Sequence, residues 1–149
     1  DARKKEVAVI VLKRLAVLDT YLLDKLVTGT GETAKQLVIY TIMKPDRLFF
    51  EFMREVFQDK LIVKQPYIGT GDFSLFFRNK AEQSEKIAAW TEYTYYKLQQ
   101  VYTRILYEAG FIKKSKDKLD IIRPIVDKDV AEHLKRIGDG RYVDILQGV

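Results

Sequence analysis

The sequence has no cysteine and only one histidine, and these scarcities exclude several kinds of site. Without cysteine, the chain can hold neither a disulfide nor a thiolate-bound zinc or iron–sulfur centre. It also lacks the short motifs of phosphate-binding loops, dinucleotide-binding folds, serine hydrolases and zinc peptidases. We therefore expect no enzymatic activity, no cofactor and no metal.

Long hydrophobic runs are missing as well. The longest run near the N-terminus, Val7 to Leu12, is ended by Lys13 and Arg14. It is far shorter than the roughly 20 apolar residues that a membrane-spanning helix needs. We therefore expect no membrane partner. Because the absence of cysteine gives no reason to expect an oxidising compartment, we expect a cytoplasmic protein.

The composition is that of a folded protein. Hydrophobic residues make up 47% of the 149 positions and charged residues 32%, which is enough for a substantial core and argues against disorder. The formal net charge of +5 favours acidic partners. The positions of the positive charges in the folded protein determine whether they can bind an acidic partner.

Apolar residues recur at helical spacing through the first part of the chain. This spacing predicts one helix from about Arg3 to Val27, a second that ends near Met43, and a third with Pro45 at its first position. The segment Gln65 to Gly71 then interrupts the periodicity. We therefore expect an N-terminal helical bundle, residues 1–65, closely packed on a second half, residues 66–149.

The second half begins with three predicted helices. Asp72, Ser84 and Thr91 are suitable N-cap residues for them, and Gly110 suits the end of the third and longest. Beyond it, Phe111–Ile112 and Leu119 to Ile122 are rich in strand-forming residues and flank a polar loop, so they predict a small β-hairpin.

After the hairpin, Asp127 opens a predicted helix that runs through Ile137, and a short apolar turn from Tyr142 to Leu146 follows. Three helices followed by a hairpin is the chain order of a winged helix. The predicted fold is therefore mainly α, a helical bundle with a winged-helix-like half that contains a small β-hairpin.

In a winged helix, the third helix enters the major groove of DNA and the hairpin loop lies against the phosphates. Lys97, Gln100 and Arg104 share one face of the predicted third helix because they are spaced by three and four residues. The N-terminal end of that helix favours a phosphate, and lysines fill the hairpin loop. The predicted contacts to double-stranded DNA are therefore Thr91, Thr94, Lys97, Gln100, Arg104, Lys113, Lys114, Lys116 and Lys118.

Other interpretations of the same residues remain open. A lysine-rich turn that also contains Asp117 and Asp120 is equally typical of a solvated loop. Exposed aromatic rings beside basic groups can stack unpaired bases, or can form a surface for other proteins. Binding of RNA by a helical bundle is a further alternative. The tyrosines that could stack unpaired bases are Tyr93, Tyr95, Tyr96, Tyr102 and Tyr107, and the surface for other proteins would lie around Tyr93, Tyr96 and Tyr107.

The one histidine stands four residues after an acid. Asp129 and His133 would lie side by side on a helix, as two metal ligands can. A capped helix with acids in its first turn and a surface histidine explains the same pattern more simply. We therefore expect no metal site here.

The segment LVIYTIMKPDRLFFEFMREVFQDKL, Leu37 to Leu61, resembles the BrxA-like family of small proteins of BREX phage-defence systems. The likeness resumes at Asp72-Phe73 and Phe76-Phe77, and again in KLQQVYTRILYEAGFI, Lys97 to Ile112. The resemblance implies a helical, non-catalytic DNA-binding protein that works with other phage-defence proteins.

Overall fold

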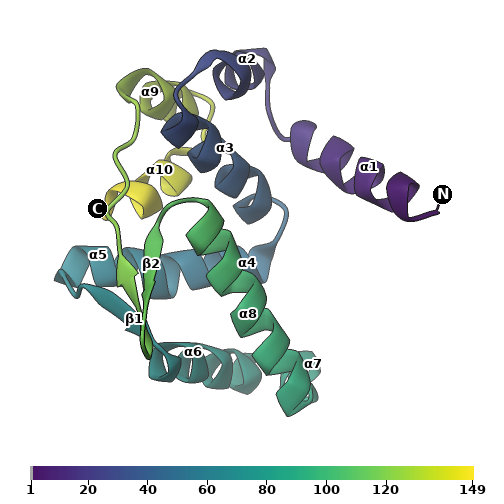
Figure 1. Ribbon diagram of the computed structural model, residues 1–149, viewed down its shortest axis with the longest axis vertical. Helices are drawn as coiled ribbons and strands as arrows, with labels where there is room; N and C mark the ends of the chain where they lie inside the picture. The colour runs from purple at the N-terminus through teal and green to yellow at the C-terminus, as the bar shows by residue number, and fades with distance from the viewer. Residues whose placement is uncertain (1) are drawn as a thin grey trace.

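The computed structural model describes residues 2–149, and within the first helix it describes the side chains of residues 2, 4, 5, 9 and 12–15. Three helices come first, α1 (Ala2–Leu15), α2 (Thr20–Thr28) and α3 (Gly31–Met43). Figure 1 shows α1 projecting away from the body of the molecule, with the N-terminus at its far end.

The prediction of a single helix from Arg3 to Val27 was wrong. The chain leaves the helix after Leu15 and begins a new one at Thr20. The cause is Asp19, whose Oδ1 accepts a hydrogen bond of 2.8 Å from the backbone N–H of Leu22 and so caps the start of α2.

The next helix is continuous but changes its pitch. It consists of α4 (Arg47–Phe52), the π-helical segment η1 (Met53–Gln58) and α5 (Asp59–Val63). Pro45 lies outside it, contrary to the prediction, because the N-cap is Asp46, whose carboxylate accepts a hydrogen bond of 3.1 Å from the N–H of Phe49.

The π-helical segment has a clear effect on packing. A π turn holds one residue more than an α turn, so it rotates all later side chains by about 100° relative to an unbroken α-helix. That rotation returns Leu61 to the apolar side of the helix, where it is only 4% exposed.

After a short strand, β1 (Tyr67–Gly69), the chain forms α6 (Thr70–Gln83), α7 (Glu85–Ala88) and α8 (Glu92–Glu108). The predicted N-caps Ser84 and Thr91 are confirmed. Asp72 is not an N-cap as predicted. It lies in the first turn of α6, where its carboxylate accepts a hydrogen bond of 2.8 Å from the N–H of Gly69.

The predicted hairpin is confirmed as β2 (Ile112–Ser115) and β3 (Lys118–Ile121), which pair antiparallel with Lys114 opposite Leu119. The strand β1 was not predicted. It pairs antiparallel with the other edge of β3, with Ile68 opposite Leu119, so the sheet order is β1-β3-β2. The lysine-rich loop therefore extends from a three-stranded sheet rather than from an isolated hairpin.

Two helices complete the chain, α9 (Lys128–Arg136) and α10 (Gly140–Gln147). The N-cap of α9 is Asp127, as predicted. The last apolar segment is a full helix rather than the short turn that we expected. Within the described residues, no helix is both long and apolar enough to span a membrane.

The core is rich in aromatic rings. Phe52 stacks on Phe73 of α6 at a centroid distance of 5.1 Å and lies 5.0 Å from the ring of Tyr102 in α8. The ring of Tyr142 in α10 packs edge-on against Phe50 at 5.3 Å. The buried cluster extends from Leu18 to Leu146 and joins every helix of that span except α7. The fold class is mainly α with a small antiparallel sheet, as predicted.

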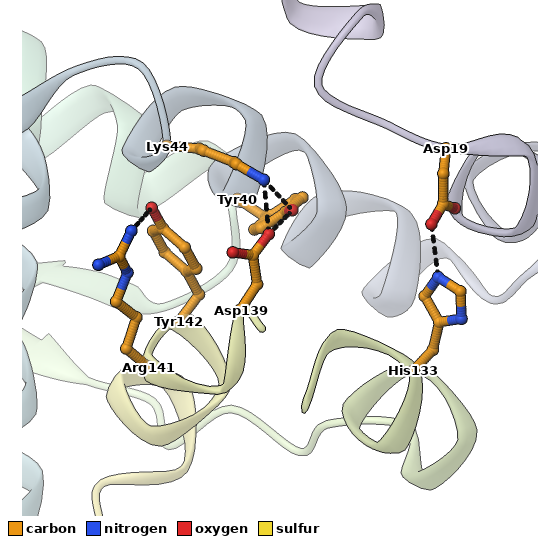
Figure 2. A network of polar contacts seen from close by, with 7 residues as sticks. All are labelled: Asp19, Tyr40, Lys44, His133, Asp139, Arg141 and Tyr142. Atoms are coloured by element: carbon orange, nitrogen blue, oxygen red, sulfur yellow. Dashed lines mark hydrogen bonds and ion pairs between the residues drawn. The ribbon is translucent and has the colours of Figure 1, made fainter. Parts of the chain in front are cut away.

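Polar contacts join the first helices to the last two (Figure 2). Asp139, in the turn between α9 and α10, accepts hydrogen bonds from Tyr40 at 2.5 Å and from Lys44 at 2.6 Å. In a second contact, His133 Nε2 lies 2.6 Å from Asp19 Oδ2. These contacts position α9 and α10 against α2 and α3.

Candidate nucleic-acid interface

A groove of about 280 Å³ runs between α8 and the hairpin. Gln100 of α8 lines one wall, and Lys114, Lys116 and Lys118 line the other. Asp117 is the one carboxylate among the lining residues, so three cations and one anion give the groove a net charge of +2. The structure therefore brings four of the nine predicted contact residues together.

Two of the groove lysines lie over exposed tyrosine rings. Lys118 Nζ is 4.6 Å from the ring centroid of Tyr67, and Lys114 Nζ is 5.1 Å from that of Tyr107. Such cation–π contacts restrain long side chains without neutralising their charge. Neither tyrosine is among the residues that line the groove, so the contacts hold the two lysines beside it with their positive charge available to an anion.

The N-terminal part of α8 carries three more predicted residues outside this groove. Lys97 is exposed, with Nζ 5.8 Å from the ring of Tyr93. The hydroxyl oxygen of Thr91 accepts a hydrogen bond from the N–H of Thr94 at 3.2 Å, and the two threonine hydroxyl oxygens are 3.1 Å apart. The threonines thus already use part of their hydrogen-bonding capacity to cap the helix.

Arg104 lies in a different groove. It lines a cavity between α3 and α8, beside Val101 and Ile105. The inner face of the same helix is buried through Tyr102, and this burial raises the pKa of the Tyr102 phenol well above its usual value. The predicted face of Lys97, Gln100 and Arg104 is therefore divided between separate surfaces.

Lys113 is exposed on β2, opposite Asp120 in the strand register, and is not among the residues that line the groove. The groove contains residues that sequence reasoning missed. Gln99 and Thr103 add polar groups from α8, and Thr70 adds a hydroxyl from the start of α6. The only sequence signal that could have indicated Gln99 was that it is polar and directly precedes Gln100.

His133 belongs to the packing of α9 against α2. Besides its 2.6 Å contact with Asp19, its ring stacks on that of Tyr21 at a centroid distance of 4.2 Å. Burial would raise the pKa of Asp19, but hydrogen bonds from Leu22 and His133 hold it below its usual value. In the part of the chain that the structure describes, no three His, Asp or Glu side chains are grouped as metal ligands would be.

Comparisons with known proteins agree with the resemblance seen in the sequence. Residues 1–138 match the family model described as BrxA. The chain is 51% identical over 148 residues to a protein described as "BREX protein BrxA" from Bacillus cereus (strain H3081.97), and the match covers 99% of this chain and 74% of that protein.

A crystal structure of an uncharacterized protein from Magnetospirillum magneticum has the same fold. It matches with a TM-score of 0.78 at 20% sequence identity, over 92% of this chain and 72% of that one. This likeness concerns the fold alone, whereas the family model and the relative from B. cereus concern the sequence. On their evidence, the chain belongs to the BrxA family.

Proposed function

We propose that this chain is a non-catalytic, double-stranded DNA-binding component of a BREX-type phage-defence system, acting in the cytoplasm with other defence proteins. The defence role follows from membership of the BrxA family and from the name of its relative, a BREX protein. DNA binding is supported by one observation above all, the groove in which Gln100 of α8 faces three lysines of the hairpin.

The order of the elements supports a winged-helix interpretation with a different first helix from the one predicted. In that arrangement, the continuous helix α4–α5 comes first, β1 follows it, α6 is the second helix and α8 the third. The strand between the first and second helices then pairs with the second strand of the hairpin, which is the observed order β1-β3-β2. The lysine loop becomes the wing, beside the proposed DNA-contacting helix.

In this proposal, the wing lysines contact phosphates and Gln100 reaches the edge of the major groove of the DNA. Lys97 and the Thr91–Thr94 end of α8 lie along the same helix. Lysine contacts to phosphate position a protein without recognising bases, so sequence preference would be slight. Each neutralised phosphate steepens the fall of affinity with salt by roughly 0.9 in log–log slope.

The test uses two triple variants of equal charge. In the first, Lys114, Lys116 and Lys118 become Ser. In the matched control, the exposed residues Lys13, Lys128 and Lys135, which lie elsewhere, become Ser. Fluorescence anisotropy with a labelled duplex, measured across a salt series, should show the groove variant losing at least about tenfold in affinity, and up to about 3 units of salt slope, while the control loses little.

Equal losses in the two variants would show that net charge alone attracts DNA and would refute the groove assignment. Absence of binding to any duplex at low salt would refute DNA binding and favour a scaffold that uses the exposed tyrosines Tyr93, Tyr96 and Tyr107. Competition with single-stranded DNA and with RNA tests the remaining alternatives, because a stronger competitor than duplex DNA would be the preferred ligand.

A further inference from the structure

An apolar groove between α3 and α8 lies apart from the proposed DNA surface. It has a volume of about 480 Å³. Val38 and Ile42 line it from α3, and Val101 and Ile105 line it from α8. Val38 is 43% exposed and Val101 is 41% exposed, so two branched apolar side chains stand open at its mouth. Covering such apolar surface with a partner removes it from water and stabilises the complex.

The rim of this groove is basic. Arg14 at the end of α1, Lys35 of α3 and Arg104 of α8 line it, against a single acid, Glu108. Among the side chains that the structure describes, none of the three cations forms an ion pair. Three cations and one anion therefore give an apolar groove with a net charge of +2.

We propose that this groove binds an amphipathic helix of a partner protein that has an apolar face and acidic flanks. Apolar side chains at positions i, i+3 or i+4, and i+7 of such a helix would cover the two open valines. Acidic residues beside them would meet Arg104 and Lys35. A nucleic acid fits less well, because its phosphates would meet the cations while the valines stayed uncovered.

Charge also argues against a second copy of this chain as the occupant. The projecting helix α1 exposes Leu12 and Val9 and could in principle seat in the groove of another molecule. Its sequence, however, carries five basic residues and one acid, so it is basic like the rim. Like charges that face each other at an interface are unfavourable, so the acidic helix is the better complement.

The test uses two fluorescein-labelled synthetic helices of about four turns with the same leucine pattern. One carries glutamate at its flanking positions and the other carries lysine. Fluorescence anisotropy with the full chain should show binding of the acidic helix, with a Kd on the order of micromolar, and at least tenfold weaker binding of the basic one. Val101→Glu should weaken binding of the acidic helix at least about tenfold, because it removes apolar surface and adds a like charge.

A charge exchange sharpens the result. The double variant Lys35→Glu with Arg104→Glu should reverse the preference toward the basic helix. The matched control, Arg78→Glu with Lys86→Glu, makes the same charge change at exposed positions elsewhere and should preserve the preference for the acidic helix. Circular dichroism checks folding, and Val38→Glu on α3 replaces Val101→Glu if that variant does not fold.

Three outcomes would overturn the proposal. The first is equal binding of the two synthetic helices, or binding of neither. The second is the same reversal of preference in the control double variant, which would assign the effect to net charge. The third is self-association of the unmodified chain in sedimentation that Val101→Glu abolishes, because the occupant would then be a second copy.

Discussion

Tyr40 of α3 donates a hydrogen bond to Asp139, a residue 99 positions later in the chain, with an oxygen–oxygen distance of 2.5 Å. Lys44, one helical turn after Tyr40, lies 2.6 Å from the same carboxylate oxygen. Burial, together with the neighbouring carboxylate, raises the pKa of the Tyr40 phenol well above its usual value. Tyr40 therefore remains a donor throughout the ordinary pH range and ties α3 to the start of α10.

Replacing Tyr40 with Phe should destabilise the protein. The ring still fills its place in the core, but Asp139, which is only 6% exposed, loses one of its two donors. Loss of a hydrogen bond to a buried carboxylate should lower the free energy of unfolding by about 1–3 kcal/mol, measured by urea denaturation. Tyr96→Phe is the control, because Tyr96 is 58% exposed and should tolerate the change. Equal stability of the two variants would contradict the role of the Tyr40 hydroxyl.

Asp139 should also make stability depend on pH in the acid range. Burial would raise the pKa of Asp139, but the hydrogen bonds from Lys44 and Tyr40 hold it below its usual value. The unfolded chain therefore takes up a proton at higher pH than the folded one. The stabilisation from Asp139 is complete above about pH 4 and is lost as the pH falls through its lowered folded pKa.

The measurement is urea denaturation of the unmodified protein and of Asp139→Asn at about pH 6 and about pH 3. The difference in free energy of unfolding between the two proteins should shrink at the lower pH, because the Asp139 carboxylate of the unfolded chain is protonated there, and this favours unfolding of the unmodified protein. A difference of the same size at each pH would mean that the Asp139 charge does not contribute.

Lys80 should be important for stability because its charge is buried between two acids. It is only 5% exposed, and its Nζ lies 2.5 Å from Glu55 and 3.1 Å from Glu51. Burial would raise the pKa of Glu51, but Lys80 and Arg47 hold it below its usual value. Lys80→Met should lower the free energy of unfolding by about 1–3 kcal/mol, since the acids lose their shared cation but remain partly solvated.

A double-mutant cycle tests this cluster. Adding Glu55→Gln to Lys80→Met should recover part of the lost stability, because one of the two carboxylates left without a cation is removed. If the effects of the two substitutions simply add, the contact between Lys80 and Glu55 contributes nothing.

Lys64 should be a site where the natural residue lowers stability. It ends α5 with φ 60°, in the left-handed region that residues other than glycine adopt only at a cost in free energy. Its side chain is exposed. Lys64→Gly should raise the free energy of unfolding by about 0.5–1 kcal/mol, as thermal or urea denaturation would show. Lys64→Ala keeps the Cβ and should give no gain, and a gain from Ala equal to that from Gly would contradict the explanation.

Helix boundaries could be predicted wherever a capping residue coincided with a break in the apolar period. Ser84, Thr91 and Asp127 are such cases. The break before α2 was hidden because Val17 and Leu18 continue the apolar pattern, although the chain is not helical there. The strand β1 is only three residues long, and its pairing partner lies about fifty residues away, so neither period nor length could reveal it.

The sequence could place the proposed contact residues on their helix and hairpin, but it could not show which of them share a surface. Spacing correctly places Gln100 and Arg104 near each other on α8. It cannot tell that the hairpin packs beside one and α3 beside the other, and this packing sends the two side chains into different grooves. Similarly, capping chemistry predicted the role of Thr91 in the helix, but not that its hydroxyl lies so close to that of Thr94.

The π-helical turn from Met53 to Gln58 has a consequence for how this gene can change in length. Each turn of that segment encloses one amino acid more than an α-helix needs. Loss of a single codon there would leave a well-formed α-helix in which α5 keeps its rotation about the helix axis, because the π turn already absorbs the extra residue, so Leu61 would stay in the core. Gene variants that are one codon shorter within this segment would therefore bury the same residues beyond it, whereas a one-codon loss in the α-helical part of the same helix would rotate the following residues by about 100°.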